Sequence, residues 1–529
     1  MRGVLLGFLC WIAQDSTVPL TPGLQLERRI GPGDRHVYIA TLETGAAVLA
    51  RVEQKGVDVV IDVTGPDGQR LAHLDNASGS QGSESIAITA VNAGTYRFAI
   101  HTANDSVPAG VYAIRVDRIL GSADNARRLA KDTYPNPTVY KLWESSLSDS
   151  GAPARFVADR GAKGPLIEPI AGNSREMSVT YFRVGDAHTA RMLLGGGPDF
   201  MGLEMKRIGR TDVFFGTQIV PKDARFVYAF NLFKRRRAGP NGEVELNDVV
   251  HSEDAVLEMP DAPRQAYIVP REGAPRGTLT VTTIASKFLG EDRKITVYTP
   301  PGYDGRTPAR LLIVFDGGAY GAIPGQEASV PTPTILDNLI TEKKIPATVG
   351  ILVWSMGKRT RDLPGSKPFA DFVATEVVHW ARANYAIRPG AGSVVVAGSS
   401  LGGYAATFIA HSNPAQIGNV LSQSGSYWIS RDWQKADGDF VHRLYPRETG
   451  TMIEAFRSSP KLPIRFYLEI GIYDLGAAML GSNRELFEVL RSKGYSVDYR
   501  EFAGGHSYEN WRGSLADGLI SLLGARSAR

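Results

Sequence analysis

The pattern of apolar and polar positions changes character about halfway along the chain. Up to about residue 271, short strand-like runs such as 57–63 and 224–230 alternate with turn-forming residues. From about residue 277, continuous apolar runs alternate with longer segments of helical periodicity. Short strands with frequent turns are typical of β-sandwiches, whereas continuous apolar runs indicate strands covered on both faces of a sheet. The pattern therefore predicts two β modules followed by an α/β domain.

Five segments follow from this pattern and its interruptions. We predict a signal peptide at 1–17, a β-sandwich at 18–120, a linker with helical and polar stretches at 121–163, an immunoglobulin-like β module at 164–271, and an α/β domain with a mostly parallel sheet at 272–529. Apolar residues recur at helical spacing between residues 369 and 380, which predicts an amphipathic crossover helix in the α/β domain.

The amino-terminal segment resembles a short export signal. Arg2 precedes an apolar run over residues 4–13, and polar residues follow. The run is too short to span a bilayer. Cys10, the only cysteine, lies in this segment, so a processed chain would have neither disulfides nor thiolate chemistry. We therefore expect an exported protein, periplasmic or secreted, with a truncated or misassigned start as the alternative.

Charge and motif content narrow the expected partners. The formal net charge is +4, and the basic run 234–237 precedes turn-forming residues, which favours a solvated hairpin tip over nucleic-acid or anionic-ligand binding. The nine histidines are scattered and include no His-Glu-x-x-His. No Gly-x-x-x-x-Gly-Lys loop is present. We therefore expect no metal, no nucleotide cofactor and no nucleic-acid partner.

A strand, a sharp turn and a helix are predicted to meet at Ser400. The β-branched run 394–397 leads into Gly398-Ser399-Ser400-Leu401-Gly402, which fits Gly-x-Ser-x-Gly, and a helix-forming segment follows. In such a nucleophile elbow the serine has a strained backbone that lifts its hydroxyl above the sheet edge, and the glycines leave room for neighbouring backbone. Ser400 is therefore the candidate nucleophile, with a non-catalytic glycine turn as the alternative.

Candidate partners for this serine follow in the chain order serine, acid, histidine that α/β hydrolases use. His506 lies in a glycine-rich loop before the terminal helix and is the candidate base, with His411 as its weaker rival. Asp474 comes just after the apolar run 466–470 and is the candidate acid, because open α/β sheets assemble their sites at the carboxyl ends of strands. Glu469, inside that run, is the alternative acid.

An oxyanion hole would need two backbone N–H donors beside the nucleophile. The residue after the serine, Leu401, supplies one of them in this class of elbow. The loop after the apolar run 311–315 contains Gly317 and Gly318, either of which is a candidate for the second donor. A simple glycine turn is the alternative for this loop.

Charged and aromatic residues near these positions are candidates for binding substrate. Arg359, the best of three basic residues on the loop after the run 348–353, is a candidate for anionic groups, with solvated loop charge as the alternative. Trp428 and Trp511 are candidates for an aromatic pocket that would take a phenolic or catechol acyl group. Core packing is the alternative for both tryptophans.

Several of these motifs together resemble a known family. Residues 395–403, 420–428, 504–506 and 511–513 resemble the enterochelin esterases and the wider esterase-D-like branch of α/β hydrolases. The resemblance extends over about residues 178–523. Separately, residues 57–68 and 93–98 resemble the bacterial pre-peptidase C-terminal domain, an extracellular accessory sandwich.

The family resemblance implies a serine carboxylic-ester hydrolase that acts through an acyl-enzyme, with Ser400, Asp474 and His506 as nucleophile, acid and base. In the best-known members the substrate is the trilactone of a catecholate siderophore. The additional sandwich and the export signal depart from the cytoplasmic enterochelin esterases, so feruloyl or acetyl-xylan esterase activity is an alternative. Two further alternatives are an exported acyltransferase and an inactive ligand-binding protein with the hydrolase fold.

Overall fold

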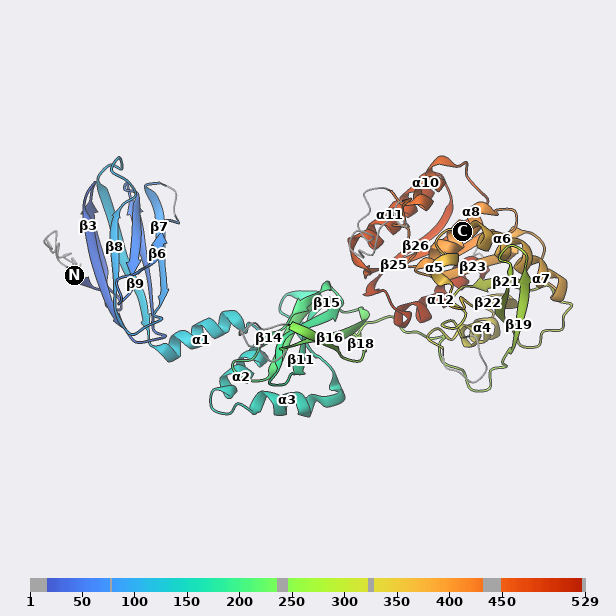
Figure 1. Ribbon diagram of the computed structural model, residues 1–529, viewed down its shortest axis with the longest axis horizontal. Coiled ribbons are helices and arrows are strands. Elements are labelled where there is room, and N and C mark those ends of the chain that lie inside the picture. Colours follow the sequence, from blue (N-terminus) through green and yellow to red (C-terminus); the bar gives the residue numbers. More distant parts are fainter. Residues whose placement is uncertain (1–16, 77–78, 236–245, 322–327, 432–448, 526–529) are drawn as a thin grey trace, which may run out of the picture. The chain divides into compact units, whose positions relative to one another are not determined.

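A computed structural model describes residues 17–76, 79–235, 246–321, 328–431 and 449–525. The chain forms two compact units, Met1–Ala152 and Pro153–Arg529 (Figure 1). Residues 1–16 of the predicted export signal and residues 236–237 of the basic run lie outside the described residues. Among the described residues, no helix combines the length and the apolar character needed to cross a membrane.

The first unit contains a β-sandwich. Its described strands are β1 (Val18–Pro19), β2 (Gln25–Ile30), β3 (Arg35–Leu42), β4 (Ala47–Lys55), β5 (Val59–Thr64), β6 (Arg70–Leu74), β7 (Gln81–Thr89), β8 (Gly94–Thr102) and β9 (Gly110–Leu120). They form one sheet in the order β1-β3-β8-β5-β6 and another in the order β2-β9-β4-β7. Apolar side chains from both sheets, among them Ile61, Phe98 and Ile114, are fully buried in one core. This is the arrangement of a face-to-face sandwich.

The segment predicted as a linker is helical. It contains α1 (Ser122–Thr133), α2 (Pro137–Ser146), α3 (Ala152–Arg160) and the single 3-10 turn η1 (Gly161–Lys163). Asn125 of α1 donates to the backbone oxygen of Gly45 at 2.9 Å, which attaches α1 to the first sandwich. Phe156 of α3 packs edge to face on Phe182 of the second β module, with ring centroids 5.5 Å apart.

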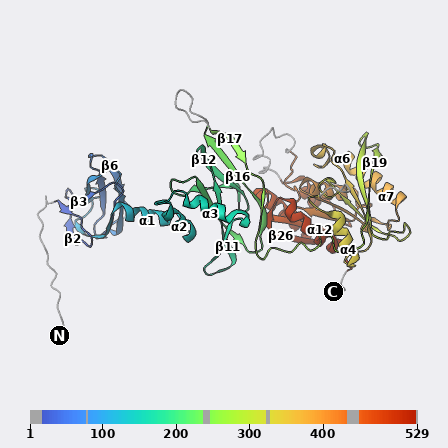
Figure 2. The ribbon, with the colours of Figure 1, turned by 90° about the horizontal axis from the view of Figure 1, so that it is seen from below.

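The second β module opens the second unit. Its described strands are β10 (Leu166–Ile170), β11 (Asn173–Val184), β12 (Thr189–Gly196), β13 (Asp199–Glu204), β14 (Lys206–Arg207), β15 (Val213–Pro221), β16 (Arg225–Arg235), β17 (Leu246–His251) and β18 (Ala255–Glu258). One sheet has the order β10-β11-β15-β14, and in the other β16 pairs with β12, β17 and β18. At its start, β16 also pairs in parallel with the last strand of the α/β domain, as Figure 2 shows.

The α/β domain is built on a mixed sheet. Its described strands are β19 (Thr278–Ser286), β20 (Glu291–Thr299), β21 (Arg310–Val314), β22 (Thr348–Val353), β23 (Val394–Ser399), β24 (Asn419–Gln423), β25 (Arg465–Tyr473) and β26 (Ser496–Gly505), in the spatial order β26-β25-β24-β23-β21-β22-β20-β19. Neighbours from β26 to β22 run parallel, whereas β20 and β19 add antiparallel pairs at the edge. The predicted parallel sheet is therefore present, with an antiparallel edge and the join to β16.

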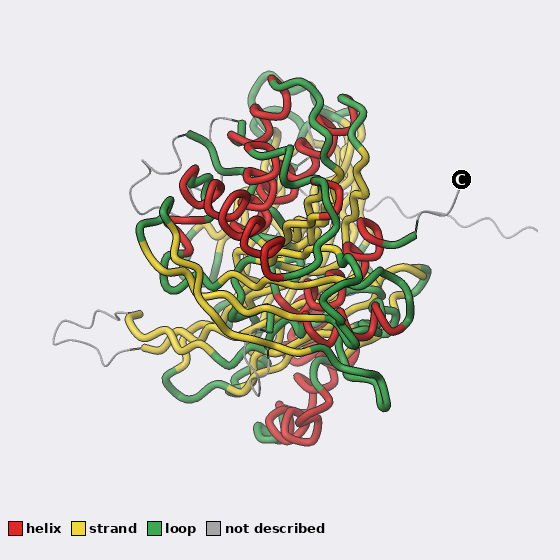
Figure 3. Tube along the Cα trace, turned by 90° about the vertical axis from the view of Figure 1, so that its right-hand side faces the viewer, coloured by secondary structure: helices red, strands yellow, loops and turns green. Residues whose placement is uncertain are grey.

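Helices cover both faces of this sheet (Figure 3). They are α4 (Thr332–Thr341), α5 (Arg359–Asp362), α6 (Lys367–Asp371), the π-helical segment η2 (Phe372–Val377), α7 (Val378–Asn384), the 3-10 turn η3 (Ala391–Ser393), α8 (Leu401–Ser412), α10 (Thr451–Ser458), α11 (Gly476–Ser492) and α12 (Tyr508–Leu523). Val396 of β23 packs in the core under α8, α10 and α11, and its neighbour Val395 packs under α4 and α12. Burial on both sides explains the continuous apolar runs.

Candidate active site

Ser400 lies at the turn between β23 and α8 in a strained backbone conformation. Its φ is 58° and its ψ is −122°, a region that residues with a Cβ rarely adopt. Backbone hydrogen bonds hold the turn: Ser400 N–H donates to the backbone oxygen of Gln423 at 2.9 Å, and the backbone oxygen of Ser400 accepts from the N–H groups of Ser426 and Tyr404 at 3.1 Å each. A Cβ on Gly398 would lie 2.7 Å from the Gly402 carbonyl carbon, so glycine lets the strand approach the helix. This is the elbow geometry that the motif predicts.

The second close approach at the elbow is at Gly403. A Cβ there would lie 2.4 Å from Ser422 Oγ, whereas a Cβ on Gly402 would meet only ordinary contacts at 3.7 Å. We expect Gly403→Ala to lower the free energy of unfolding by about 1–3 kcal/mol, because the short Ser422 side chain cannot move aside. Gly402→Ala, on the same helix, should change it by less than about 1 kcal/mol. Urea unfolding of both variants checks this, and equal losses would contradict it.

Asp474 and His506 form a hydrogen-bonded pair. His506 Nδ1 lies 2.6 Å from Asp474 Oδ1, which also accepts the Leu475 N–H at 2.7 Å. The Asp474 side chain is fully buried and that of His506 is 18% exposed. The imidazole also packs edge to face on Trp511, with centroids 4.8 Å apart. Its Nε2 has no hydrogen-bond partner among the described residues, so the buried carboxylate orients the ring and leaves Nε2 available.

The structure brings Ser400, Asp474 and His506 to one edge of the sheet. They follow β23, β25 and β26, which lie in the parallel series β23-β24-β25-β26, so their carboxyl ends share this edge. Ser400 Oγ lies 3.5 Å from Ser426 Oγ, and no hydrogen bond joins Ser400 to His506 within the described residues. In unliganded hydrolases this bond is often long and shortens when substrate binds.

His411 does not lie at this edge. It is near the far end of α8, about 16 Å along the helix from Ser400 at 1.5 Å per residue. Its ring packs edge to face on Phe456, and its Nε2 lies 3.4 Å from Ser459 Oγ. Burial lowers the pKa of His411. It is therefore a packed histidine, and the weaker of the two predicted bases is wrong.

Two serines that the sequence did not single out help to shape the site. Ser426 contacts the candidate nucleophile, and Ser424 accepts the Trp511 indole N–H at 3.2 Å. Ser424 has a φ of 49°, so the chain turns sharply just after β24. Both belong to the segment 420–428 of the family resemblance, which was the available signal.

Backbone donors for an oxyanion are present at Leu401 and Gly318. No hydrogen bond uses either N–H within the described part of the chain. The N–H of Gly317, in contrast, donates to the Val353 oxygen at 2.9 Å and so extends the pairing of β21 with β22. Of the two predicted glycines, Gly317 is therefore excluded and Gly318 remains. Asp316, with a φ of 54°, turns the chain into this loop.

Arg359 is engaged by the protein itself. Its Nε donates to both carboxylate oxygens of Asp316, at 2.9 and 3.0 Å. Its Nη2 donates to the backbone oxygen of Ser399 at 3.4 Å. The side chain is 35% exposed. The residue predicted to bind anionic substrate groups thus connects the oxyanion loop to the last residue of β23, and we assign it a positioning role.

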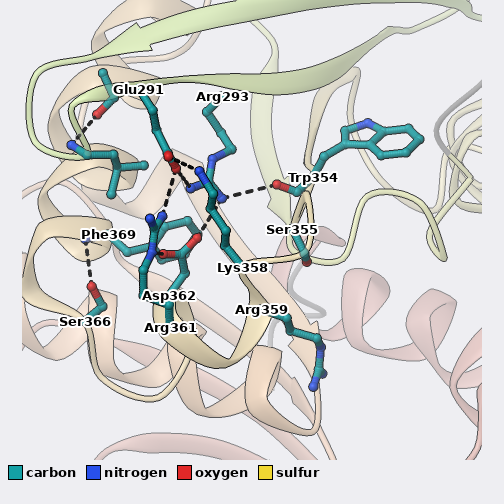
Figure 4. Close-up of polar contacts among 12 residues, drawn as sticks. Glu291, Arg293, Trp354, Ser355, Lys358, Arg359, Arg361, Asp362, Ser366 and Phe369 are labelled. Carbon is teal, nitrogen blue, oxygen red and sulfur yellow. Dashed lines mark hydrogen bonds and ion pairs between the residues drawn. The ribbon is translucent and has the colours of Figure 1, made fainter.

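An ion-pair cluster holds the segment that carries Arg359. Arg293, only 1% exposed, contacts Asp362 and Glu291 at 2.7 Å each, and Arg361 and Lys358 complete the cluster. Hydrogen bonds from Arg361 and its neighbours lower the pKa of Glu291 to about 2. Figure 4 shows the Arg359 side chain pointing away from these partners. The cluster therefore fixes α5 and leaves Arg359 to reach Asp316.

The two predicted aromatic contacts are packed inside the domain. Trp428 is 8% exposed and belongs to the core between the sheet and α8, α10 and α11. Trp511 is 3% exposed and supports the His506 ring. Neighbouring Tyr427 is fully buried. Core packing, the alternative for both tryptophans, is what the structure shows.

Glu469, the alternative acid, lies in a separate network. Its carboxylate accepts hydrogen bonds from Gln423 Nε2 at 3.0 Å, from the Tyr467 hydroxyl at 2.9 Å and from Ser514. The side chain is 1% exposed, and burial raises its pKa to about 7. Because His506 bonds Asp474, Glu469 is not the orienting acid. Among the described residues, no group of histidine, cysteine and acidic side chains is arranged to hold a metal ion.

The raised pKa of Glu469 predicts a pH-dependent stability. The folded chain keeps this proton up to about pH 7, whereas the unfolded chain loses it near the ordinary value of 4.5. The stabilisation is therefore complete below the ordinary value and is lost as the pH rises through 7, by an amount on the order of 3 kcal/mol. Urea unfolding at about pH 5 and about pH 8 should show this decline, and Glu469→Gln should flatten it. An equal decline in the variant would assign it to other groups.

An elbow serine, an oriented imidazole and free backbone donors at one sheet edge define the class of serine hydrolases built on an α/β sheet. Residues 286–522 match the family model described as "Putative esterase". Over these residues the C-terminal domain is similar to the esterases of this family.

Curated relatives match about half of the chain. The iron(III) enterobactin esterase of Escherichia coli K12 is 29% identical over 271 residues, which is 51% of this chain and 62% of the relative. That of Dickeya dadantii is 29% identical over 278 residues, 51% of this chain and 61% of the relative. The iron(III) salmochelin esterase of Escherichia coli O6:H1 is 28% identical over 241 residues, which is 45% of this chain and 56% of the relative. The chain thus spans about three fifths of the length of the first two relatives.

Solved structures show the same fold over a longer stretch. The ferric enterobactin esterase from Salmonella typhimurium has a TM-score of 0.55 and 24% identity, covering 69% of this chain and 98% of that one. The enterochelin esterase from Shigella flexneri has a TM-score of 0.53 and 23% identity, covering 69% and 97%. At these identities the likeness shows the fold.

Proposed function

We propose that the protein is a serine carboxylic-ester hydrolase that acts through an acyl-enzyme at Ser400. The hydrogen bond between Asp474 and His506 carries this proposal, because it orients an imidazole at the same sheet edge as a serine in the elbow conformation. A buried carboxylate that orients a histidine is the arrangement that lets a serine hydroxyl act as a nucleophile.

The reaction would proceed in two steps, acylation of Ser400 and hydrolysis of the acyl-enzyme. His506 Nε2 takes the proton from Ser400 Oγ as the oxygen attacks the ester carbonyl, and the oxyanion that forms accepts hydrogen bonds from the N–H groups of Leu401 and Gly318. When the tetrahedral intermediate collapses, the ester C–O bond breaks and His506 gives its proton to the departing alkoxide. Water then attacks the acyl-enzyme with the same base, which releases the acid and restores Ser400.

A fluorophosphonate probe tests this chemistry directly. It should form a covalent adduct at Ser400, found by mass spectrometry of the peptide, because only an activated serine attacks the phosphorus. A folded chain that hydrolyses no ester and remains unlabelled would instead support the inactive ligand-binding alternative. Product analysis with added alcohols separates hydrolysis from acyl transfer.

We propose ester bonds of catecholate siderophores as the substrate class. The support is the match of residues 286–522 to an esterase family model, together with similar proteins that are esterases of iron(III) enterobactin and iron(III) salmochelin. A panel of ferric catecholate trilactone, feruloylated sugar and acetylated sugar tests this choice. We expect the trilactone to be opened to hydroxy-acid products with the highest kcat/KM, and preference for a sugar ester would overturn it.

We also propose that hydrolysis takes place outside the cytoplasm, on the strength of the apolar run at residues 4–13. Cell fractionation and amino-terminal sequencing of the mature chain test this. An unprocessed chain in the cytoplasmic fraction would contradict it.

A further inference from the structure

The second β module contacts the α/β domain directly beside the candidate acid–base pair. Arg225, at the start of β16, pairs in parallel with Gly504 of β26, two residues before His506. The approach is close, because a Cβ on Gly504 would lie 2.7 Å from the Arg225 backbone oxygen. The neighbouring Gly505 is in register with Tyr473, which precedes the acid. The end of β26 is therefore held between the β module and the strand of the acid.

An aromatic contact connects the module to the acid side of the pair. The ring of Phe226 packs edge to face on that of Tyr473, with centroids 5.7 Å apart and planes at 85°. Phe226 is fully buried in the core of the β module. Tyr473 is adjacent to Asp474 in the chain, so this core extends to the backbone that carries the acid.

A polar clamp connects the module to the helix that follows the base. Gln265 Nε2 donates to the backbone oxygen of Glu509 at 2.6 Å, and its side-chain oxygen accepts from Arg512 Nε at 2.8 Å. A Cβ on Gly513 would lie 2.7 Å from Gln265 Cγ, so glycine is needed for the side chain to lie against the helix. The clamp therefore holds the first turns of α12, directly after His506.

Arg225 connects the clamp back to β16. Its guanidinium is buried and donates to Glu258 at 2.9 Å and to the Pro263 oxygen at 2.8 Å, two residues before Gln265. A cavity of about 260 Å³ lies beside these contacts, lined in part by Arg225, Gln265 and Gly513. Arg225 therefore connects the segment that carries Gln265 to the strand that pairs with β26.

We propose that the second β module positions the acid–base pair, with Phe226 and Gln265 as positioning residues. This inference rests on the proposed function. The module holds the backbone on both sides of the short loop that carries His506 and packs on the residue before Asp474. Small displacements of a catalytic group cost large factors in rate, so loosening these contacts slows the reaction even though neither residue touches substrate.

Two full-length variants and a matched control test the proposal. Gln265→Ala removes both clamp bonds from a half-buried position and should leave the fold intact. Phe226→Leu removes the ring contact. The control is Phe214→Leu, which alters a phenylalanine of the same core, 3% exposed, on a strand that pairs only with β11 and β14 among the described strands.

The readouts are steady-state kinetics on a p-nitrophenyl ester and amide hydrogen exchange of the peptide that spans 502–512. Relative to the control, both test variants should lower kcat by about tenfold or more, change KM by less than about twofold, and speed exchange in that peptide. Gln265→Glu keeps the acceptor for Arg512 and should recover part of kcat.

The outcomes separate the positioning role from the proposed function. Test variants with the kcat of Phe214→Leu, or with unchanged exchange in 502–512, would overturn the positioning role. A wild-type chain that hydrolyses no ester and is not labelled at Ser400 would refute the proposed function instead. Exchange does not require activity, so it would still decide whether the module holds the loop of His506.

Discussion

Replacing Ser400 with alanine should lower the rate of ester hydrolysis by about 10⁴- to 10⁶-fold, the scale on which loss of the nucleophile acts in serine hydrolases. The loss should appear in kcat, because the oxyanion donors and the binding surface remain. Stability should change little. Alanine has the same Cβ as serine at a φ of 58°, and within the described part of the chain the hydrogen bond that is lost is the one to Ser426 Oγ at 3.5 Å. Hydrolysis of a p-nitrophenyl ester, with circular dichroism, measures both.

The control for this prediction is the adjacent serine. Ser399→Ala alters a side chain that is 1% exposed and lies at the end of β23 rather than at the elbow. We expect it to retain kcat within about tenfold, since its hydroxyl has no part in the reaction. A large loss in Ser399→Ala together with a small one in Ser400→Ala would move the nucleophile by one residue.

Asp474→Asn should lower kcat by about 10³- to 10⁴-fold. Asparagine keeps the size of the side chain and an oxygen for the Leu475 N–H, but it removes the negative charge that stabilises the imidazolium and favours the correct tautomer of His506. The fold should persist, because the site stays filled. Single-turnover kinetics on an activated ester would show whether the loss lies in acylation.

Glu469→Gln is the contrast for the acid. Its partners are Gln423, Tyr467 and Ser514, so the substitution should cost less than about tenfold in kcat while changing the pH dependence of stability. A ranking in which Glu469→Gln is the more damaging variant would transfer the role of the acid to Glu469.

Much of the site was predictable because its signals are local. The elbow at Ser400 needs a strand, two glycines and a helix within a short stretch of sequence. Asp474 and His506 each follow a strand-like run, and parallel strands bring such positions to one edge. The mostly apolar runs likewise predicted the parallel part of the sheet, since residues such as Val395 and Val396 are buried on opposite faces.

The rest depends on contacts that no local pattern encodes. Gly317 and Gly318 are adjacent and identical in type, but Val353 on the neighbouring strand takes up one N–H and leaves the other. Arg359 has the chemistry of an anion ligand, and only the structure shows that its Nε lies 2.9 Å from the Asp316 carboxylate. Trp428 was suited equally to a pocket and to a core, and only packing decides. The helices in 121–163 have mixed polar sequences, and the contacts of α1 and α3 with the two β modules are not encoded in any local pattern.

The order of the strands has a consequence for how the protein is made. β26 is the last strand of the described chain, and the residue that would activate Ser400 follows it. A nascent polypeptide therefore exposes its hydroxyl-bearing turn well before the histidine has been translated. We expect chains cut short before His506 to be inert, because the base that would activate Ser400 is missing from them.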